Sequence, residues 1–234
     1  MPVDELPYED YKCRRWVKNY FYDLEWYEVY DLTEFTVNNH VAMTREYYSY
    51  GHDYRDHEVS KLDLIKRINF ILERELSGYR FISGILTPIS TKAEVDQIEE
   101  AVQAASREGL PGAHQHITTA LALLGKRPEP DYRNAIKEAI SAVESVVKQI
   151  SGAQSRGLDD ALRELSEKAE IHGVLKSGFK KLYGYSSDED GIRHAILDLP
   201  NVGFSEAKYM IVSCSAFVNY LIAKAVEVDI IRSS

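Results

Sequence analysis

An arginine and a histidine stand side by side in the stretch GYSSDEDGIRHAILD, residues 184–198. Histidine can take up and release a proton near neutral pH, because its pKa lies there. Arginine keeps its charge, and its planar guanidinium group matches the oxygens of a phosphate. Arg193 and His194 are therefore candidates for chemistry on a phosphate ester. In the alternative interpretation, the two side chains only neutralise the acids at 188–190 where a helix begins.

A basic segment lies directly before this pair. Residues 171–187 contain no acid and carry Lys176, Lys180 and Lys181. Ammonium groups neutralise backbone phosphates, so we expect these three lysines to position RNA if RNA is bound. The alternative is that the lysines only form a solvated helix face. His172 and Lys176, which are four residues apart, are also typical of such a face.

Glu144 is a further candidate, because it lies among apolar residues in the stretch AISAVESVV. A half-buried carboxylate needs a partner, since an unpaired buried charge is costly. Arg193 is a candidate partner, either in a catalytic pair or in a pair that only joins two helices. Glu138, six residues earlier, could contribute to the same site.

Other histidines give weaker signals. His114 and His116 are two residues apart and point to different sides of a helix, so we expect no metal site there. Arg45, His52 and His57 lie in a Tyr-rich stretch that we interpret as a loop packed on aromatic residues. The chain has no Gly-rich phosphate loop, serine nucleophile elbow or zinc-ligand set, and we expect it to need no cofactor.

Composition limits the class of protein. The chain has 234 residues, of which 44% are hydrophobic, enough for one substantial domain or two small ones. Cys13 and Cys214 are expected to be reduced packing thiols, and no leader is recognisable, so a cytoplasmic location is predicted. The apolar run over residues 210–223 contains polar residues and is too short for a bilayer, so no membrane partner is expected.

The charge is unevenly distributed. The net charge is -9, which argues against nucleic-acid binding over the whole surface. Residues 1–60 hold 13 acids and 6 bases. Tyrosines are crowded before residue 55 and could stack on bases, but the acidic balance favours a protein partner for this amino-terminal part.

The elements that must position these residues are mainly helical. Apolar spacings of three and four predict helices, and residues that suit strands predict one β-hairpin near 79–90 with Gly84 at its middle. Capping patterns at Ser60 and Thr91, and an N-cap at Asp131, mark helix starts. The expected helices cover residues 13–31, 60–76, 92–105, 114–124, 132–151, 158–169, 171–184 and 205–228.

A family resemblance accompanies this pattern. The stretch RINFILERELSGYRFISGILTPISTKAEVDQIEEAV resembles the amino-terminal module of one group of AbiJ-type abortive-infection proteins, a bacterial anti-phage family. The stretches PDYRNAIKEAISAVESVV, IHGVLKSGFKKLYGYSSDEDGIRHAI and EAKYMIVSCSAFVNYLI are similar to the carboxy-terminal helical part of that group. More distantly, that part is similar to the HEPN superfamily of helical bundles. The resemblance implies an AbiJ-like module over residues 1–110 and a HEPN-like bundle over residues 111–234.

The resemblance also implies an activity. HEPN ribonucleases need no metal, and their signature is an Arg followed a few residues later by a His, in a site commonly completed across a dimer interface. Here Asp198 stands where that His is expected, and the available imidazole is His194. Our first hypothesis is a phage-defence endoribonuclease with Arg193, His194 and Glu144 in its site and RNA as its partner. The alternative is a non-catalytic module that forms a homodimer through its last helix and binds a protein or small effector through its amino-terminal part.

Overall fold

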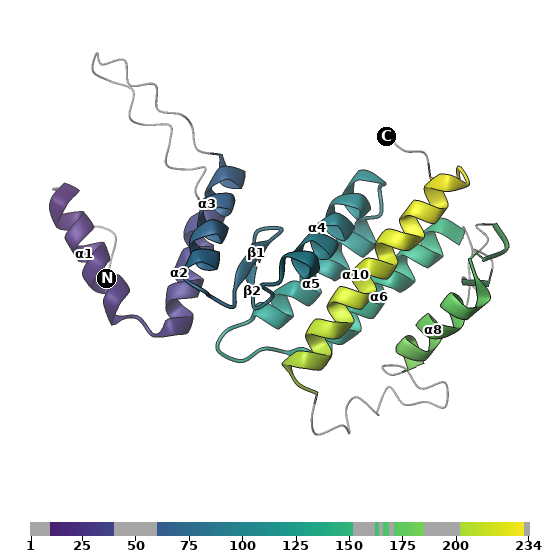
Figure 1. Ribbon diagram of the computed structural model, residues 1–234. Helices are drawn as coiled ribbons and strands as arrows, with labels where there is room; N and C mark the ends of the chain where they lie inside the picture. The colour runs from purple at the N-terminus through teal and green to yellow at the C-terminus, as the bar shows by residue number, and fades with distance from the viewer. Residues whose placement is uncertain are drawn as a thin grey trace, which may run out of the picture. The chain divides into compact units, whose positions relative to one another are not determined.

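The computed structural model of the chain describes residues 10–39, 60–151, 162–163, 166–168, 171–184 and 202–231 (Figure 1). The chain divides into two compact units, Met1–Lys66 and Arg67–Ser234. The described residues are mainly helical, and their strands form one two-stranded antiparallel sheet. The predicted fold class is therefore confirmed, while the relation to HEPN bundles stays a prediction.

The first unit contains a helix break that the sequence analysis missed. The helix predicted over residues 13–31 is wrong, because two helices, α1 (Asp10–Asp23) and α2 (Trp26–Asn38), cover this stretch. At Glu25 the backbone is extended, with φ -66° and ψ 155°. Its N–H donates a hydrogen bond of 2.8 Å to the Glu28 carboxylate. Glu25 therefore begins a new helix, in a place where an acid also suits the helix dipole.

Helix α3 (Lys61–Arg74) begins as predicted and leads into the hairpin. The Ser60 hydroxyl oxygen accepts a hydrogen bond of 3.1 Å from the Asp63 N–H, which caps the helix. Further along, the Asn69 amide bonds both backbone groups of Phe81: its oxygen accepts from the N–H at 2.7 Å, and its NH₂ donates to the carbonyl at 3.0 Å. A helix side chain thus satisfies an edge of the first strand.

The predicted hairpin is confirmed. Strand β1 (Arg80–Ile82) pairs antiparallel with β2 (Ile85–Thr87) in the register Arg80↔Thr87. The turn residues Ser83 and Gly84 have φ values of 51° and 83°. A two-residue hairpin turn needs positive φ at these positions, which explains the glycine.

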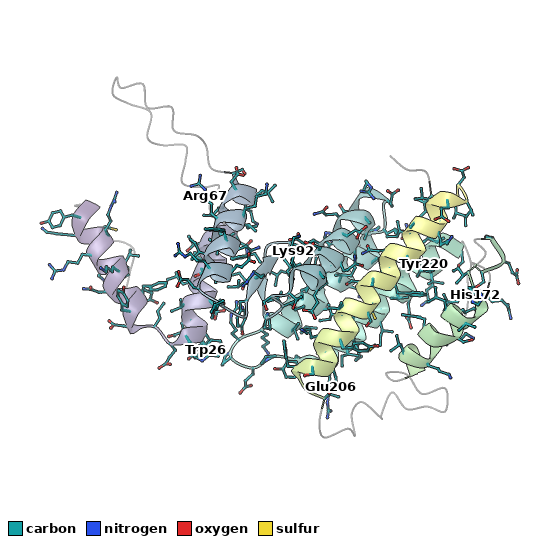
Figure 2. All side chains as sticks on the ribbon, viewed as in Figure 1. Trp26, Arg67, Lys92, His172, Glu206 and Tyr220 are labelled. Atoms are coloured by element: carbon teal, nitrogen blue, oxygen red, sulfur yellow. The ribbon has the colours of Figure 1, made fainter. Side chains whose placement is uncertain are left out.

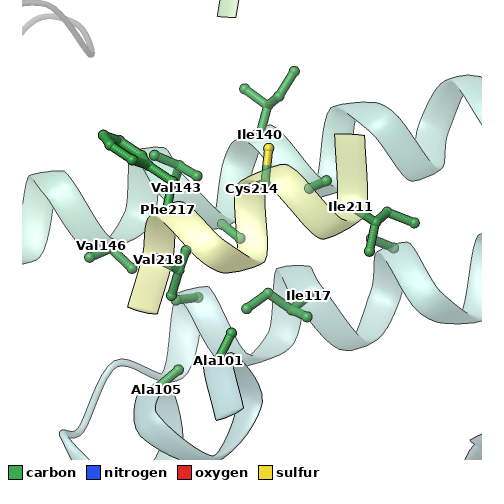
Figure 3. Packing of buried hydrophobic residues seen from close by; sticks show 14 of the residues in the cluster. Ala101, Ala105, Ile117, Ile140, Val143, Val146, Ile211, Cys214, Phe217 and Val218 are labelled. Atoms are coloured by element: carbon green, nitrogen blue, oxygen red, sulfur yellow. The ribbon is translucent and has the colours of Figure 1, made fainter. Parts of the chain in front are cut away.

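Four long helices enclose the core of the second unit: α4 (Lys92–Arg107), α5 (Pro111–Gly125), α6 (Tyr132–Ser151) and α10 (Phe204–Glu227). Helix α10 packs against the other three, and its Cys214, Phe217 and Val218 point into the core (Figure 3). A shorter helix, α8 (Gly173–Gly184), joins the same core through Phe179. The hairpin and α4 thus share a core with helices that follow residue 110. The proposed domain boundary there stays a prediction.

The helix starts confirm the predicted positions, but one cap differs. The Asp131 carboxylate accepts a hydrogen bond of 3.1 Å from the Asn134 N–H and caps α6 as expected. A second bond, from the Asn134 side chain, is the largest cause that lowers the pKa of Asp131. Thr91 precedes α4 as predicted but makes no side-chain cap bond. Glu94, its expected partner, instead accepts from Lys208 of α10 at 2.8 Å.

Helix α10 has the length and composition of a membrane span. Its 24 residues include a window apolar enough to cross a bilayer, so the expectation that the run over residues 210–223 is too short does not hold for the whole helix. Half of that window is buried inside the bundle. A core helix of a bundle passes the same test, so length and composition alone are weak evidence for a span.

Candidate nucleic-acid interface

Helix α8 carries the lysines that the sequence analysis assigned to RNA. One aromatic contact fixes the helix: Phe179 is 5% exposed, and its ring stacks on Phe217 of α10 with centroids 3.9 Å apart. Lys176 and Lys180 are half-buried and four residues apart, so the helical repeat places them on one face with His172, one turn earlier. Figure 2 labels His172 at the start of α8. No acid stands in α8. Helix α8 is therefore anchored through its apolar side and carries its cations along a different side.

A cavity of about 430 Å³ lies beside the last lysine. It opens between α8 and the first turns of α10 and is lined by Gly178, Lys181, Leu182, Glu206, Tyr209 and Met210. Met210 is 2% exposed, whereas the Tyr209 ring is 56% exposed and can offer a stacking face. The size is within the range of small-molecule sites. The cavity combines an apolar floor, an aromatic ring and a cation.

One acid at this cavity already has a structural task. The Glu206 carboxylate accepts a hydrogen bond of 3.0 Å from the Gly203 N–H. It therefore caps the start of α10, where Figure 2 shows it. Lys181 is then the charged lining residue best placed to meet an anionic ligand.

The two acids considered for catalysis lie on α6 and have different neighbours. Glu144 is paired with Lys148 of its own helix at 3.6 Å, and 27% of its side chain is exposed. Glu138 contacts the Nδ1 atom of His116 on α5 at 2.7 Å. The side chains of this second pair are 37% and 30% exposed, His116 and Glu138 respectively. The structure thus joins two facing helices through an imidazole and a carboxylate.

Both residues of this pair are candidates in the sequence, but no motif in the sequence connects them. His116 was weighed only against His114, as a metal ligand. A short connector between α5 and α6 predicts that the two helices run antiparallel and face each other. Polar positions on the two helices could have been matched in that way, although the register of the pairing depends on the packed side chains.

Several predicted residues lie outside the described part of the chain. These are Arg193, His194 and Asp198, and also Arg45, His52 and His57. Whether Arg193 meets Glu144 therefore stays a prediction. Within the described ranges, no group of three or more His, Cys, Asp or Glu side chains could hold a metal ion.

The two cysteines differ in burial. Burial raises the pKa of the Cys214 thiol to about 12, so the group stays protonated at neutral pH and acts in packing. Cys13 is half-buried on α1. Both thiols are free.

The comparison with known families concerns the amino-terminal part. Residues 1–104 match the family model of AbiJ N-terminal domain 4. This part of the chain is therefore similar to AbiJ N-terminal domains. The resemblance of residues 67–102 to an AbiJ amino-terminal module is thereby confirmed, and the match extends it to the first residue. The AbiJ match supports a protein of abortive infection or defence.

The AbiJ match ends inside α4, so it does not reach α5, α6, α8 or α10. No curated protein and no solved structure matches the chain. The HEPN-like interpretation of the carboxy-terminal helices thus depends on the residues themselves.

Proposed function

We propose that this AbiJ-type protein acts in phage defence as a HEPN-like, metal-independent endoribonuclease of the cytoplasm. The observation that carries the proposal is α8, which has lysines, no acid, and a cavity at Lys181. Phosphate groups meet the lysines, and a base enters the cavity beside the Tyr209 ring.

The reaction needs two functions besides binding. The 2′-oxygen of a ribose attacks the adjacent phosphorus and loses its proton, while the 5′-oxygen of the next nucleotide leaves and gains one. His194 carries these proton transfers, and Arg193 stabilises the charge on the phosphorane. Glu144, half-buried on α6, orients the guanidinium of Arg193. Arg193 and His194 take these roles in the proposal because of their chemistry.

The test is a cleavage assay on bulk tRNA and single-stranded RNA with EDTA present. We expect the wild-type chain to cleave RNA, and His194→Ala or Arg193→Ala to lower the rate about 100-fold or more. Combined Lys176→Gln, Lys180→Gln and Lys181→Gln should raise KM and leave kcat nearly unchanged, because these lysines act in binding. Folded wild-type protein that leaves both RNAs intact would contradict the proposal.

His116→Gln is the matched control for His194→Ala. Each change removes one imidazole, and the structure pairs the His116 imidazole with a carboxylate, that of Glu138. We expect His116→Gln to leave the cleavage rate near that of the wild type. A rate that falls with His116 and not with His194 would assign proton transfer to the α5–α6 pair.

A second candidate function is a non-catalytic binding module. The observation that favours it is that both acids considered for catalysis have partners nearby, His116 for Glu138 and Lys148 for Glu144. In this reading, the chain forms a homodimer through the part of α10 not buried in the bundle and binds a protein at the amino-terminal part. Light scattering of the purified chain tests the dimer, since a monomer at micromolar concentration would contradict it.

A further inference from the structure

The break at Glu25 separates two helices of opposite charge. Helix α1 carries Lys12, Arg14, Arg15 and Lys18, and its acids are Asp10 and Asp23, near its two ends. Helix α2 has three acids and no base. Residues 1–60 thus have a negative net charge overall although they include a basic helix, α1.

Cations and tyrosines share one face of α1. At 3.6 residues per turn, Arg14, Arg15 and Lys18 lie on the same side as Tyr11 and Tyr22. All three cations are exposed. The two tyrosines are 65% and 75% exposed, the highest values among the large apolar and aromatic side chains of this helix. We call this set the basic face of α1.

Rings and ammonium groups are close together on α1. The Lys18 Nζ atom lies 6.0 Å from the centroid of the Tyr22 ring, and the Lys12 Nζ atom lies 5.7 Å from that of Tyr11. Such neighbours suit single-stranded nucleic acid, because its bases stack on exposed rings while its phosphates meet the cations. Each ring then contacts a base beside the charge that holds the adjoining phosphate.

A groove lies next to the basic face. It has a volume of about 390 Å³ and is lined by Cys13, Arg14, Val17, Lys18, Phe21 and Tyr22. Val17 and Phe21 are 46% and 40% exposed and supply an apolar floor. The groove offers apolar surface to a base, with cations at its edge for the phosphate.

We propose that the basic face of α1 is a binding surface for single-stranded RNA. The choice of RNA among polyanions rests on the proposed function, whereas the surface itself rests on the charge and ring pattern of α1. An amphipathic helix at a lipid surface keeps its aromatic residues on the apolar side. In α1 the two most exposed rings stand among the cations instead, which favours RNA.

The test measures binding apart from cleavage. A fluorescent single-stranded 2′-O-methyl RNA cannot be cleaved through its 2′-oxygen. Its fluorescence anisotropy, measured with the full chain, therefore reports binding without cleavage. Arg15→Gln with Lys18→Gln should lower the slope of log Kobs against log salt by about 1.4, since each contact with a single strand contributes about 0.7. Tyr22→Ala should weaken binding about fivefold or more, as expected for the loss of one stacked base.

The matched control removes the same charge elsewhere. Lys126 and Lys137 are exposed in the second unit, so Lys126→Gln with Lys137→Gln changes net charge equally and should leave the salt slope at the wild-type value. Circular dichroism checks that each variant is folded. Equal slopes for the two double variants would overturn the proposal.

Two further outcomes are informative. A wild-type chain that binds vesicles of anionic phospholipid through Arg15 and Lys18, and leaves the RNA unbound, would overturn the proposal in favour of a membrane face. Binding that depends on α1 in a chain that cleaves no RNA would support the surface and contradict the nuclease. The two proposals therefore fail separately.

Discussion

At the scale of single residues, Glu99 is a carboxyl group whose charged form the fold disfavours. Burial is the largest cause that raises the pKa of this carboxyl, and the charge of Asp96 adds to it. The backbone N–H of Ser83, in the hairpin turn, donates to the carboxylate and acts in the opposite direction. Glu99 therefore links α4 to the hairpin at a cost that depends on pH.

Glu99→Gln should stabilise the chain at neutral pH. Because the folded pKa is raised, the native state binds more protons than the unfolded state between the two pKa values, and stability falls as pH rises through that range. Glutamine cannot ionise, yet its oxygen can still accept from Ser83. We expect a gain of less than about 1 kcal/mol, because the carboxyl is only half-buried.

Urea unfolding at several pH values measures this gain. The difference between Glu99→Gln and the wild type should vanish below the ordinary pKa of glutamate, where both side chains are neutral. A difference that is constant over the whole range would show that shape, and not charge, is responsible.

Properties that depend only on the type of a residue, such as its charge or its apolar character, could be predicted from the sequence. The lysines of α8 and the apolar character of Cys214 were visible in that way. The pairing of His116 with Glu138 was not, because it depends on the rotation and register of two packed helices. The basic character of α1 was hidden for another reason: charges were summed across the unpredicted break at Glu25.

At the scale of elements, the end of α5 approaches β2 closely. A Cβ atom on Gly125 would lie 2.8 Å from the Leu86 carbonyl oxygen, which is backbone and cannot turn aside. The same oxygen accepts a hydrogen bond of 2.7 Å from Arg127. The glycine thus allows the helix end to contact the hairpin.

Gly125→Ala should destabilise the chain by about 1–3 kcal/mol, because the hairpin must move away from the helix. The matched control is Gly112→Ala in the same helix, where the new Cβ would meet the Ser145 hydroxyl, a side-chain group that can rotate. We expect this control to be nearly neutral. Thermal unfolding of both variants checks the pair, and equal losses would contradict the argument.

The sequence predicted helix positions better than it predicted caps. Ser60 and Asp131 act as expected because short polar side chains reach the first free N–H groups of a helix. Glu25 was missed, since its role comes from the backbone bond to Glu28 and not from a favoured N-cap residue type. Thr91 lost its expected partner to an ion pair between Glu94 and Lys208, a contact that only the tertiary fold creates.

At the scale of the whole molecule, burial is concentrated in the second unit. Among residues 10–39 only Val37 is buried, whereas α4, α5, α6 and α10 each bury several side chains in one cluster. Short helices without tertiary packing are marginal in water. The stability of the chain therefore resides in Arg67–Ser234.

Hydrogen exchange should show this division. We expect amides of α5, α6 and α10 to exchange only on global unfolding, and amides of α1 to exchange through local opening, orders of magnitude faster. Mass spectrometry of peptic fragments measures both in one experiment. Protection of α1 as strong as that of α6 in the chain alone would contradict the division.

The packing of α4 against α10 limits how the AbiJ N-terminal domain could be exchanged between genes. The family match ends at residue 104, near the end of a helix, α4, whose Ile98, Ala101 and Ala105 belong to the core shared with α10. A recombinant protein that received this domain would also receive most of α4, which is one of the helices that enclose the core of the bundle. Inherited changes at Ile98 or Ala101 should thus be accompanied by changes in α10, so these two helices are expected to evolve together.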